Sequence, residues 1–195
     1  MPRPFSKKHK IIWPDNTCYF LTSSTFLHYP YFKEERQKQI VLNKIVQAKH
    51  SLNISIQAFS ISLNHFHLKL YTKEGNKVTK LKTILHGGIS REYKKIYKIA
   101  YPEFWHSTRT YYIKEDEETS WKITGYIIGN LLKHREVSTF KELKENSFSS
   151  YKYTAKKIGE EMAQEIVRNV INISENQEGN IDMAGLKSIK IKDCP

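Results

Sequence analysis

The chain has 195 residues, 39% of them hydrophobic, which is enough for one cored domain with an extension at most. Its 32 Lys and Arg exceed its 20 Asp and Glu, and a formal charge of +12 favours a polyanionic partner, either nucleic acid or an anionic membrane surface. No apolar run approaches the ~18 residues of a spanning helix, and the start lacks the apolar run of a signal peptide. The two cysteines, Cys18 and Cys194, form neither a disulfide framework nor a zinc pattern. We therefore expect a cytoplasmic protein without a membrane segment.

Strand and helix patterns alternate along the chain. Runs of β-branched and aromatic residues predict strands, and apolar residues at helical spacing between charges predict amphipathic helices. The expected strands cover 17–26, 54–72 (with a bend at Leu63-Asn64) and 103–116, and the expected helices cover 30–52, 77–101, 117–136 and 155–173.

This order of elements predicts an α+β fold, a ferredoxin-like antiparallel sheet with helices packed on it, followed by a C-terminal helical extension. We divide the chain into a basic N-terminal arm (1–15), a main domain (16–151) and a C-terminal helix with a mobile tail (152–195).

The stretch SISLNHFHLKLY contains two histidines, His65 and His67, in a strand pattern. Side chains alternate across a strand, so both imidazoles lie on one face, while Phe66 and Leu68 point to the other face and can pack under a helix. Two neutral imidazoles side by side are natural ligands of a divalent metal ion. The alternative is two ordinary surface or hydrogen-bonded histidines, paired by chance among the eight in the chain.

A third ligand is available in the stretch GYIIGNLLKH. Tyr126 and Asn130 are four residues apart and therefore lie one above the other on a helix. The Asn130 amide oxygen could complete the metal site, with Tyr126 beside the ion. Tyrosine is common here, with 12 in the chain, so this spacing alone is weak support.

Together, LNHFHLKL, EFWHSTRTYYIKED, YIIGN and FSSY follow one another as in the single-tyrosine HUH transposases. Over residues 16–151 the chain resembles the REP-associated tyrosine transposases and the related small insertion-sequence transposases. The histidine motif of that family typically reads M-P-N-H-x-H-L, where this chain has SLNHFHL at 62–68. Its helix motif resembles Y-I-x-x-N-P-V, where this chain has YIIGNLL at 126–132. The departures, at Ser62, Leu63 and Leu131, replace residues whose side chains do no chemistry.

The resemblance implies that the chain cleaves and rejoins single-stranded DNA, with a hairpin as the recognised element. His65, His67 and Asn130 would hold Mg²⁺ or Mn²⁺, and Tyr126 would attack the scissile phosphate to give a 5′-phosphotyrosine and a free 3′-hydroxyl. No general base for Tyr126 is evident in the sequence. Some relatives form dimers and others are monomers, so the resemblance leaves a homodimer open.

Basic side chains distributed along the chain are expected to bind DNA phosphates, which gives affinity without sequence choice. These are Lys7, Lys8 and Lys10 in the arm, Arg91, Lys94, Lys95 and Lys98 in the second helix, Arg109 in the last strand, and Lys152 after FSSY. Two other functions stay open. One is a non-catalytic module that binds single-stranded DNA or RNA on the same fold, and the other is a metal-dependent hydrolase that uses water in place of Tyr126.

Overall fold

Four antiparallel strands form the centre of the molecule, in the order β2-β3-β1-β4. The structure is a computed structural model that describes residues 12–100, 103–113, 116–175 and 181–190. The strands are β1 (Thr17–Thr25), β2 (Ser55–Ile61), β3 (His65–Thr72) and β4 (Trp105–Ile113). This strand order, with a helix after β1 and helices after β3, is ferredoxin-like and confirms the predicted fold class.

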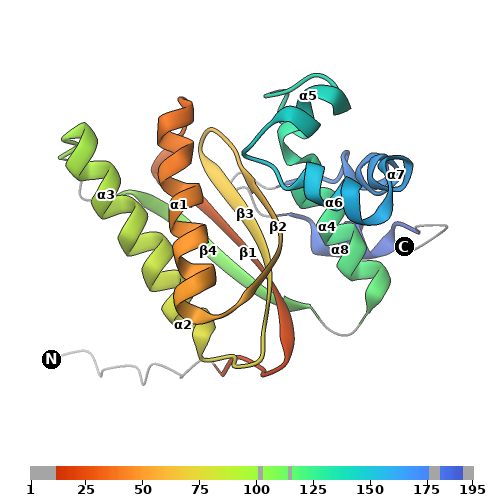
Figure 1. Cartoon of the computed structure of the whole chain (residues 1–195), viewed down its shortest axis with the longest axis horizontal. Coiled ribbons are helices and arrows are strands. Elements are labelled where there is room, and N and C mark those ends of the chain that lie inside the picture. Colours follow the sequence, from red (N-terminus) through yellow and green to blue (C-terminus); the bar gives the residue numbers. More distant parts are fainter. Residues whose placement is uncertain (1–11, 101–102, 114–115, 176–180, 191–195) are drawn as a thin grey trace, which may run out of the picture.

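Helices cover both faces of this sheet (Figure 1). One face carries α1 (Glu35–Leu52), α2 (Lys77–Lys82) and α3 (Gly88–Tyr97), the last two joined by a π-helical turn at Thr83–Gly87. The other face carries α4 (Glu117–Lys133), against which the C-terminal helices pack. No helix in the described residues has the length and apolar composition needed to cross a bilayer.

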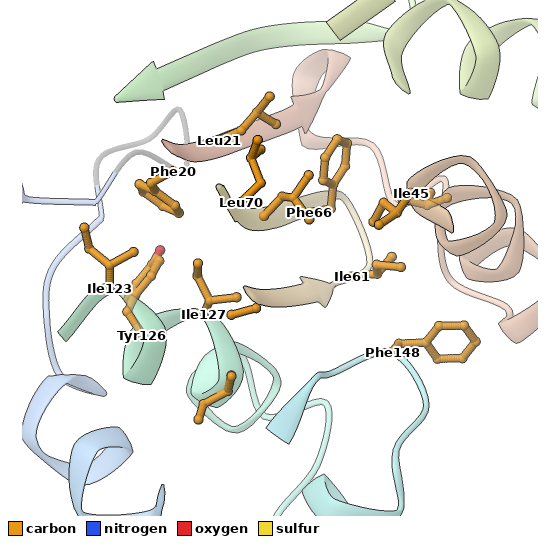
Figure 2. Packing of buried hydrophobic residues seen from close by; sticks show 14 of the residues in the cluster. Phe20, Leu21, Ile45, Ile61, Phe66, Leu70, Ile123, Tyr126, Ile127 and Phe148 are labelled. Carbon is orange, nitrogen blue, oxygen red and sulfur yellow. The ribbon is translucent and has the colours of Figure 1, made fainter. Parts of the chain in front are cut away.

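The predicted bend at Leu63-Asn64 is the turn of the β2–β3 hairpin. Alternation along β3 places Phe66 and Leu70 toward α1, and Figure 2 shows them near Leu21 and Ile45. The same figure shows Phe20 on the opposite side of the sheet, beside Tyr126 of α4. The sheet therefore separates an apolar layer under α1 from a layer under α4 that receives the histidine side chains.

Hydrogen bonds from the sheet side fix the position of α4. The buried Lys69 ammonium on β3 donates to the Ser120 carbonyl and hydroxyl, at 2.8 and 2.7 Å, and to the Thr124 hydroxyl at 2.8 Å. Further along the helix, the Ser149 hydroxyl donates to the Ile128 carbonyl at 2.9 Å. These contacts lie on either side of Tyr126 in the sequence and hold that residue over β3.

The FSSY stretch at 148–151 has a structural role. Its backbone pairs with the outer edge of β2, through Ile61 N–H to the Phe148 carbonyl and Ser150 N–H to the Phe59 carbonyl, both at 2.9 Å. This pairing continues the sheet by one short segment before α6 begins, and it brings Ser149 to α4.

A buried ion pair fixes the hairpin turn in front of the histidines. The Glu136 carboxylate lies 2.5 Å from the Lys38 ammonium of α1, and both side chains are at least nine-tenths buried. The same carboxylate accepts hydrogen bonds from the Ser62 hydroxyl and from the Leu63 N–H. The chain after α4 thus ties α1 to the turn that leads into His65.

The C-terminal region differs from its prediction. The single helix expected over 155–173 is two helices, α6 (Tyr151–Ile158) and α7 (Glu160–Val170), because Gly159 adopts a φ of 92° that ends the first one. The region expected to be a mobile tail contains α8 (Met183–Ser188), and a short helix, α5 (Phe140–Glu145), follows α4. Residues 176–180 and 191–195 lie outside the described part of the chain.

Candidate active site

The His65 imidazole is held in one orientation by Asn64. The Asn64 amide nitrogen donates to the His28 carbonyl at 3.0 Å, so its oxygen faces His65 Nδ1, 2.7 Å away. That oxygen can only accept, so the His65 proton lies on Nδ1 and Nε2 carries a lone pair. Metal-binding imidazoles are usually oriented in this way, by a hydrogen bond from the ring nitrogen that does not bind the metal to a neighbouring acceptor.

The lone pair of His65 Nε2 points at a second acceptor. The Asn130 amide oxygen on α4 lies 3.1 Å from it, and Asn130 is completely buried. A divalent ion between these two acceptors would give each of them a partner. Two ligands about 2.1 Å from one ion, at a right angle, would be ~3.0 Å apart. The observed pair therefore has the separation of two ligands of one divalent ion.

His67 lies beside His65 on the same face, with ring centres 4.9 Å apart. Its Nε2 atom is 3.4 Å from the Tyr126 hydroxyl, and its Nδ1 atom is buried without a hydrogen-bond partner. The Phe20 ring is stacked on the His67 ring and lies edge-on to the Tyr126 ring. The predicted nucleophile and both predicted imidazole ligands are thus brought together by β3 and α4.

Unpaired polar atoms gather at this site. The buried atoms without a partner in the described residues include His67 Nδ1, Asn130 Nδ2 and Ser60 Oγ, and Ser60 is the β2 residue paired with His67. Such orphaned atoms are rare in folded proteins. A cation could bind a lone pair of His67, whereas the Asn130 Nδ2 donor would need an acceptor such as water. No three His, Cys, Asp or Glu side chains in the described part of the chain are grouped to hold a metal ion. An ion here would therefore need the Asn130 amide oxygen, and the donor set of two imidazoles and one amide fits Mn²⁺ better than Mg²⁺.

Glu175 reaches the Tyr126 hydroxyl from the segment after α7. The hydroxyl donates to Glu175 Oε1 at 2.6 Å, and the carboxylate also lies 3.3 Å from Lys133 Nζ and 3.5 Å from His134 Nε2. The His134 ring centre is 4.8 Å from that of His65, so Glu175 and the side chains around it border the candidate metal site. Sequence reasoning missed Glu175 because it lies 49 residues beyond Tyr126 in a polar stretch without a motif. It also gave Asn64 no role, although Asn64 directly precedes His65 in the quoted motif.

Burial sets the protonation states in this site. Burial and the neighbouring His134 lower the pKa of His65 to about 4, and burial with the neighbouring His65 holds the pKa of His67 well below 6.5. Both imidazoles are therefore neutral at pH 7, the form that binds metal. Burial and the Glu175 carboxylate raise the pKa of the Tyr126 phenol well above 10. Burial alone would raise the pKa of Glu175, but hydrogen bonds from His134 and Tyr126 keep it below its ordinary value.

These pKa shifts predict that the metal-free protein loses stability in mild acid. A third buried histidine, His86 in the π-helical turn before α3, adds to this effect, because burial and Lys82 lower its pKa to about 4. The folded state binds fewer protons than the unfolded state between about pH 4 and 6.5. Stability should be at its full value above pH 6.5 and fall below it by about 1.4 kcal/mol per pH unit for each buried histidine. Urea unfolding at pH 7 and 5.5 measures this slope. His86→Asn should reduce the slope by about 1.4 kcal/mol per pH unit, the contribution of one histidine. If the free energy of unfolding were the same at both pH values, the histidines would not be buried in the neutral form.

The predicted DNA-binding residues fall in separate places. Arg109 on β4 is exposed on the same sheet face as His67, since it pairs with Thr22, which in turn pairs with His67. Lys152 is exposed in the first turn of α6, on the α4 side. The predicted second-helix residues, Arg91, Lys94, Lys95 and Lys98, lie in or directly after α3, on the sheet face away from α4 (Figure 1). Lys7, Lys8 and Lys10 lie outside the described residues.

Comparison with known proteins gives a structural match only. No family model matches the chain, and no curated protein matches it. A solved structure of a REP-associated tyrosine transposase bound to a REP hairpin is similar with a TM-score of 0.58 at 14% identity, covering 88% of this chain and 93% of that chain. A transposase-like protein from Deinococcus radiodurans matches with a TM-score of 0.42 at 17% identity, over 63% of this chain and 94% of that chain. The chain thus has the fold of the REP-associated tyrosine transposase to which its sequence motifs pointed.

Proposed function

We propose that this protein is a transposase that cleaves and rejoins single-stranded DNA through a 5′-phosphotyrosine at Tyr126, with His65, His67 and Asn130 as ligands of a divalent ion. Its DNA target would contain a hairpin, the element bound by the structural neighbour of the same fold. The proposal depends most on one observation. Two strand histidines and a helix tyrosine and asparagine, 59 to 65 residues apart in sequence, meet in a single buried cluster.

A divalent ion bound there would neutralise charge that develops on the scissile phosphate and orient it. The neutral state of His65 and His67 leaves their lone pairs free for this ion. Tyr126 supplies the nucleophilic oxygen, and its placement by α4 next to His67 brings that oxygen to the edge of the metal site. The phosphotyrosine bond would conserve the energy of the cleaved phosphodiester, so that a second 3′-hydroxyl can rejoin the strand without ATP.

Removing the Tyr126 hydroxyl tests this function. Purified protein is incubated with Mn²⁺ and labelled single-stranded hairpin oligonucleotides from the ends of its own locus, and the products are separated on a denaturing gel. The wild-type protein should carry label at protein size, and Tyr126→Phe should lose the adduct entirely because the nucleophilic oxygen is gone. Tyr153→Phe, which changes a tyrosine that is 70% exposed, is the matched control and should keep the adduct.

The other outcomes of this assay identify the alternatives. Cleavage without an adduct, at equal rates in wild type and Tyr126→Phe, would identify a hydrolase that uses water. Binding of DNA without cleavage under any metal would identify a non-catalytic binding module.

A further inference from the structure

The segment that follows α7 holds Glu175 against the Tyr126 hydroxyl. After α7, Ile173 is buried and its carbonyl accepts a hydrogen bond from Lys133 of α4. Glu175 then forms a β-bridge with Ile181, which precedes α8. Because the backbone is anchored at Ile173 and at Glu175 itself, the Glu175 carboxylate is presented to Tyr126.

The surroundings of the Tyr126 hydroxyl leave Glu175 as its proton acceptor. The charged and titratable groups that face it are His67 from β3, Glu175 itself, and Lys133, whose ammonium lies 5.4 Å from the centre of the tyrosine ring. His67 is 3.4 Å away and is committed to the metal site, and Phe20 from β1 offers no acceptor. Among the described residues, Glu175 is the carboxylate that accepts the hydroxyl hydrogen bond, at 2.6 Å, within the range required of a catalytic base.

We propose that Glu175 is a catalytic residue that takes the proton of Tyr126 as the phenol oxygen attacks the scissile phosphate; this inference rests on the proposed function. In cleavage, the bond from Tyr126 Oη to phosphorus forms and the bond from phosphorus to the 3′-oxygen breaks. The Tyr126 proton passes to Glu175 Oε1, and the departing 3′-oxygen takes a proton from water.

Rejoining reverses these transfers. An incoming 3′-hydroxyl attacks phosphorus and gives its proton to water, and the bond between phosphorus and Tyr126 breaks. The released phenolate oxygen takes its proton back from Glu175. Lys133 Nζ and His134 Nε2, at 3.3 and 3.5 Å from the carboxylate, hold Glu175 in position for both transfers. Glu175 thereby supplies the base that the sequence motifs did not contain.

The test measures the rate of adduct formation in a single turnover, together with DNA affinity and melting temperature. Glu175→Gln keeps the shape of the side chain and an oxygen that can accept the hydrogen bond, but it is not a base. We expect its adduct to form ~10²–10⁴-fold more slowly, with wild-type DNA affinity. Glu175→Ala should be equally slow and should be accelerated by added formate, compared with chloride at the same ionic strength. Glu161→Gln, an exposed carboxylate on α7, is the matched control and should react as wild type.

A Glu175→Gln rate within threefold of wild type would overturn the proposal, as would a Glu175→Ala deficit that formate leaves unchanged. A slow variant that also loses DNA affinity and melting temperature would show that Glu175 supports the fold rather than the proton transfer. These failures differ from failure of the proposed function, in which the wild-type protein itself would form no adduct that depends on Tyr126.

Discussion

Replacing His67 with alanine is expected to reduce DNA cleavage by ~10³-fold or more while single-strand binding stays mostly intact. The reason is that a bound metal ion contributes several kcal/mol of charge stabilisation to the transition state, and about 1.4 kcal/mol corresponds to a tenfold change in rate. We expect DNA affinity to depend instead on phosphate contacts by basic side chains elsewhere. Cleavage is measured in a single turnover with Mn²⁺, and DNA binding by fluorescence anisotropy.

The control for this substitution is His50→Ala, which removes an exposed histidine at the end of α1. Mn²⁺ affinity, measured by calorimetry without DNA, should fall in the His67 variant and stay unchanged in the His50 variant. Undiminished cleavage by His67→Ala would show that the cluster of His65, His67 and Asn130 is not the metal site.

Gly125→Ala is expected to destabilise the protein by ~3 kcal/mol, the upper end of the usual cost of overpacking. Gly125 lies on α4 directly before Tyr126, where α7 crosses closely. A methyl group there would overlap the backbone carbonyl of Ile166 and come within 3.3 Å of the Val170 side chain. Backbone cannot rotate away as a flexible side chain can, so α7 must move. Urea unfolding measures the loss. Cleavage should fall too, because α7 leads to the segment that carries Glu175.

Gly87→Ala is the matched control for this prediction. Gly87 has a helical φ of −67°, and an added methyl group would meet nothing within 4 Å. Its replacement should therefore be neutral or stabilise by up to ~1 kcal/mol, through the lower entropy of the unfolded chain. If Gly125→Ala were as stable as the wild-type protein, α7 would not pack on α4 as the structure shows.

The geometry that the sequence predicts well is local. His65 and His67 share a face because strand side chains alternate, and Tyr126 and Asn130 share a face because helical side chains repeat every three to four residues. The strand order follows from the alternation of elements. The two pairs meet because α4 packs across β3. That contact depends on Lys69, which no local pattern identifies, and on Ser149, whose FSSY motif does not reveal that its hydroxyl bonds to α4.

The features that the sequence did not predict depend on long-range packing. Charge on the second helix predicts contacts to DNA phosphates but does not reveal which face of the sheet that helix covers, and α3, which carries Lys95, lies on the face away from α4. The helix predicted over 155–173 has continuous apolar spacing, and only the left-handed backbone at Gly159 divides it. Glu175 was not predicted because its hydrogen bond with Tyr126 forms only when the segment after α7 folds back to α4.

The central claim, that Tyr126 becomes covalently joined to DNA, is tested most directly by locating the adduct. The wild-type protein is reacted with the hairpin oligonucleotide, digested with nuclease and trypsin, and analysed by mass spectrometry. Cleavage after Lys122 and Lys133 releases the peptide ITGYIIGNLLK, in which Tyr126 is the single tyrosine. A nucleotide phosphate attached to this peptide at Tyr126 is the expected result. A nucleotide on any other peptide, or strand cleavage with this peptide unmodified throughout, would contradict the account.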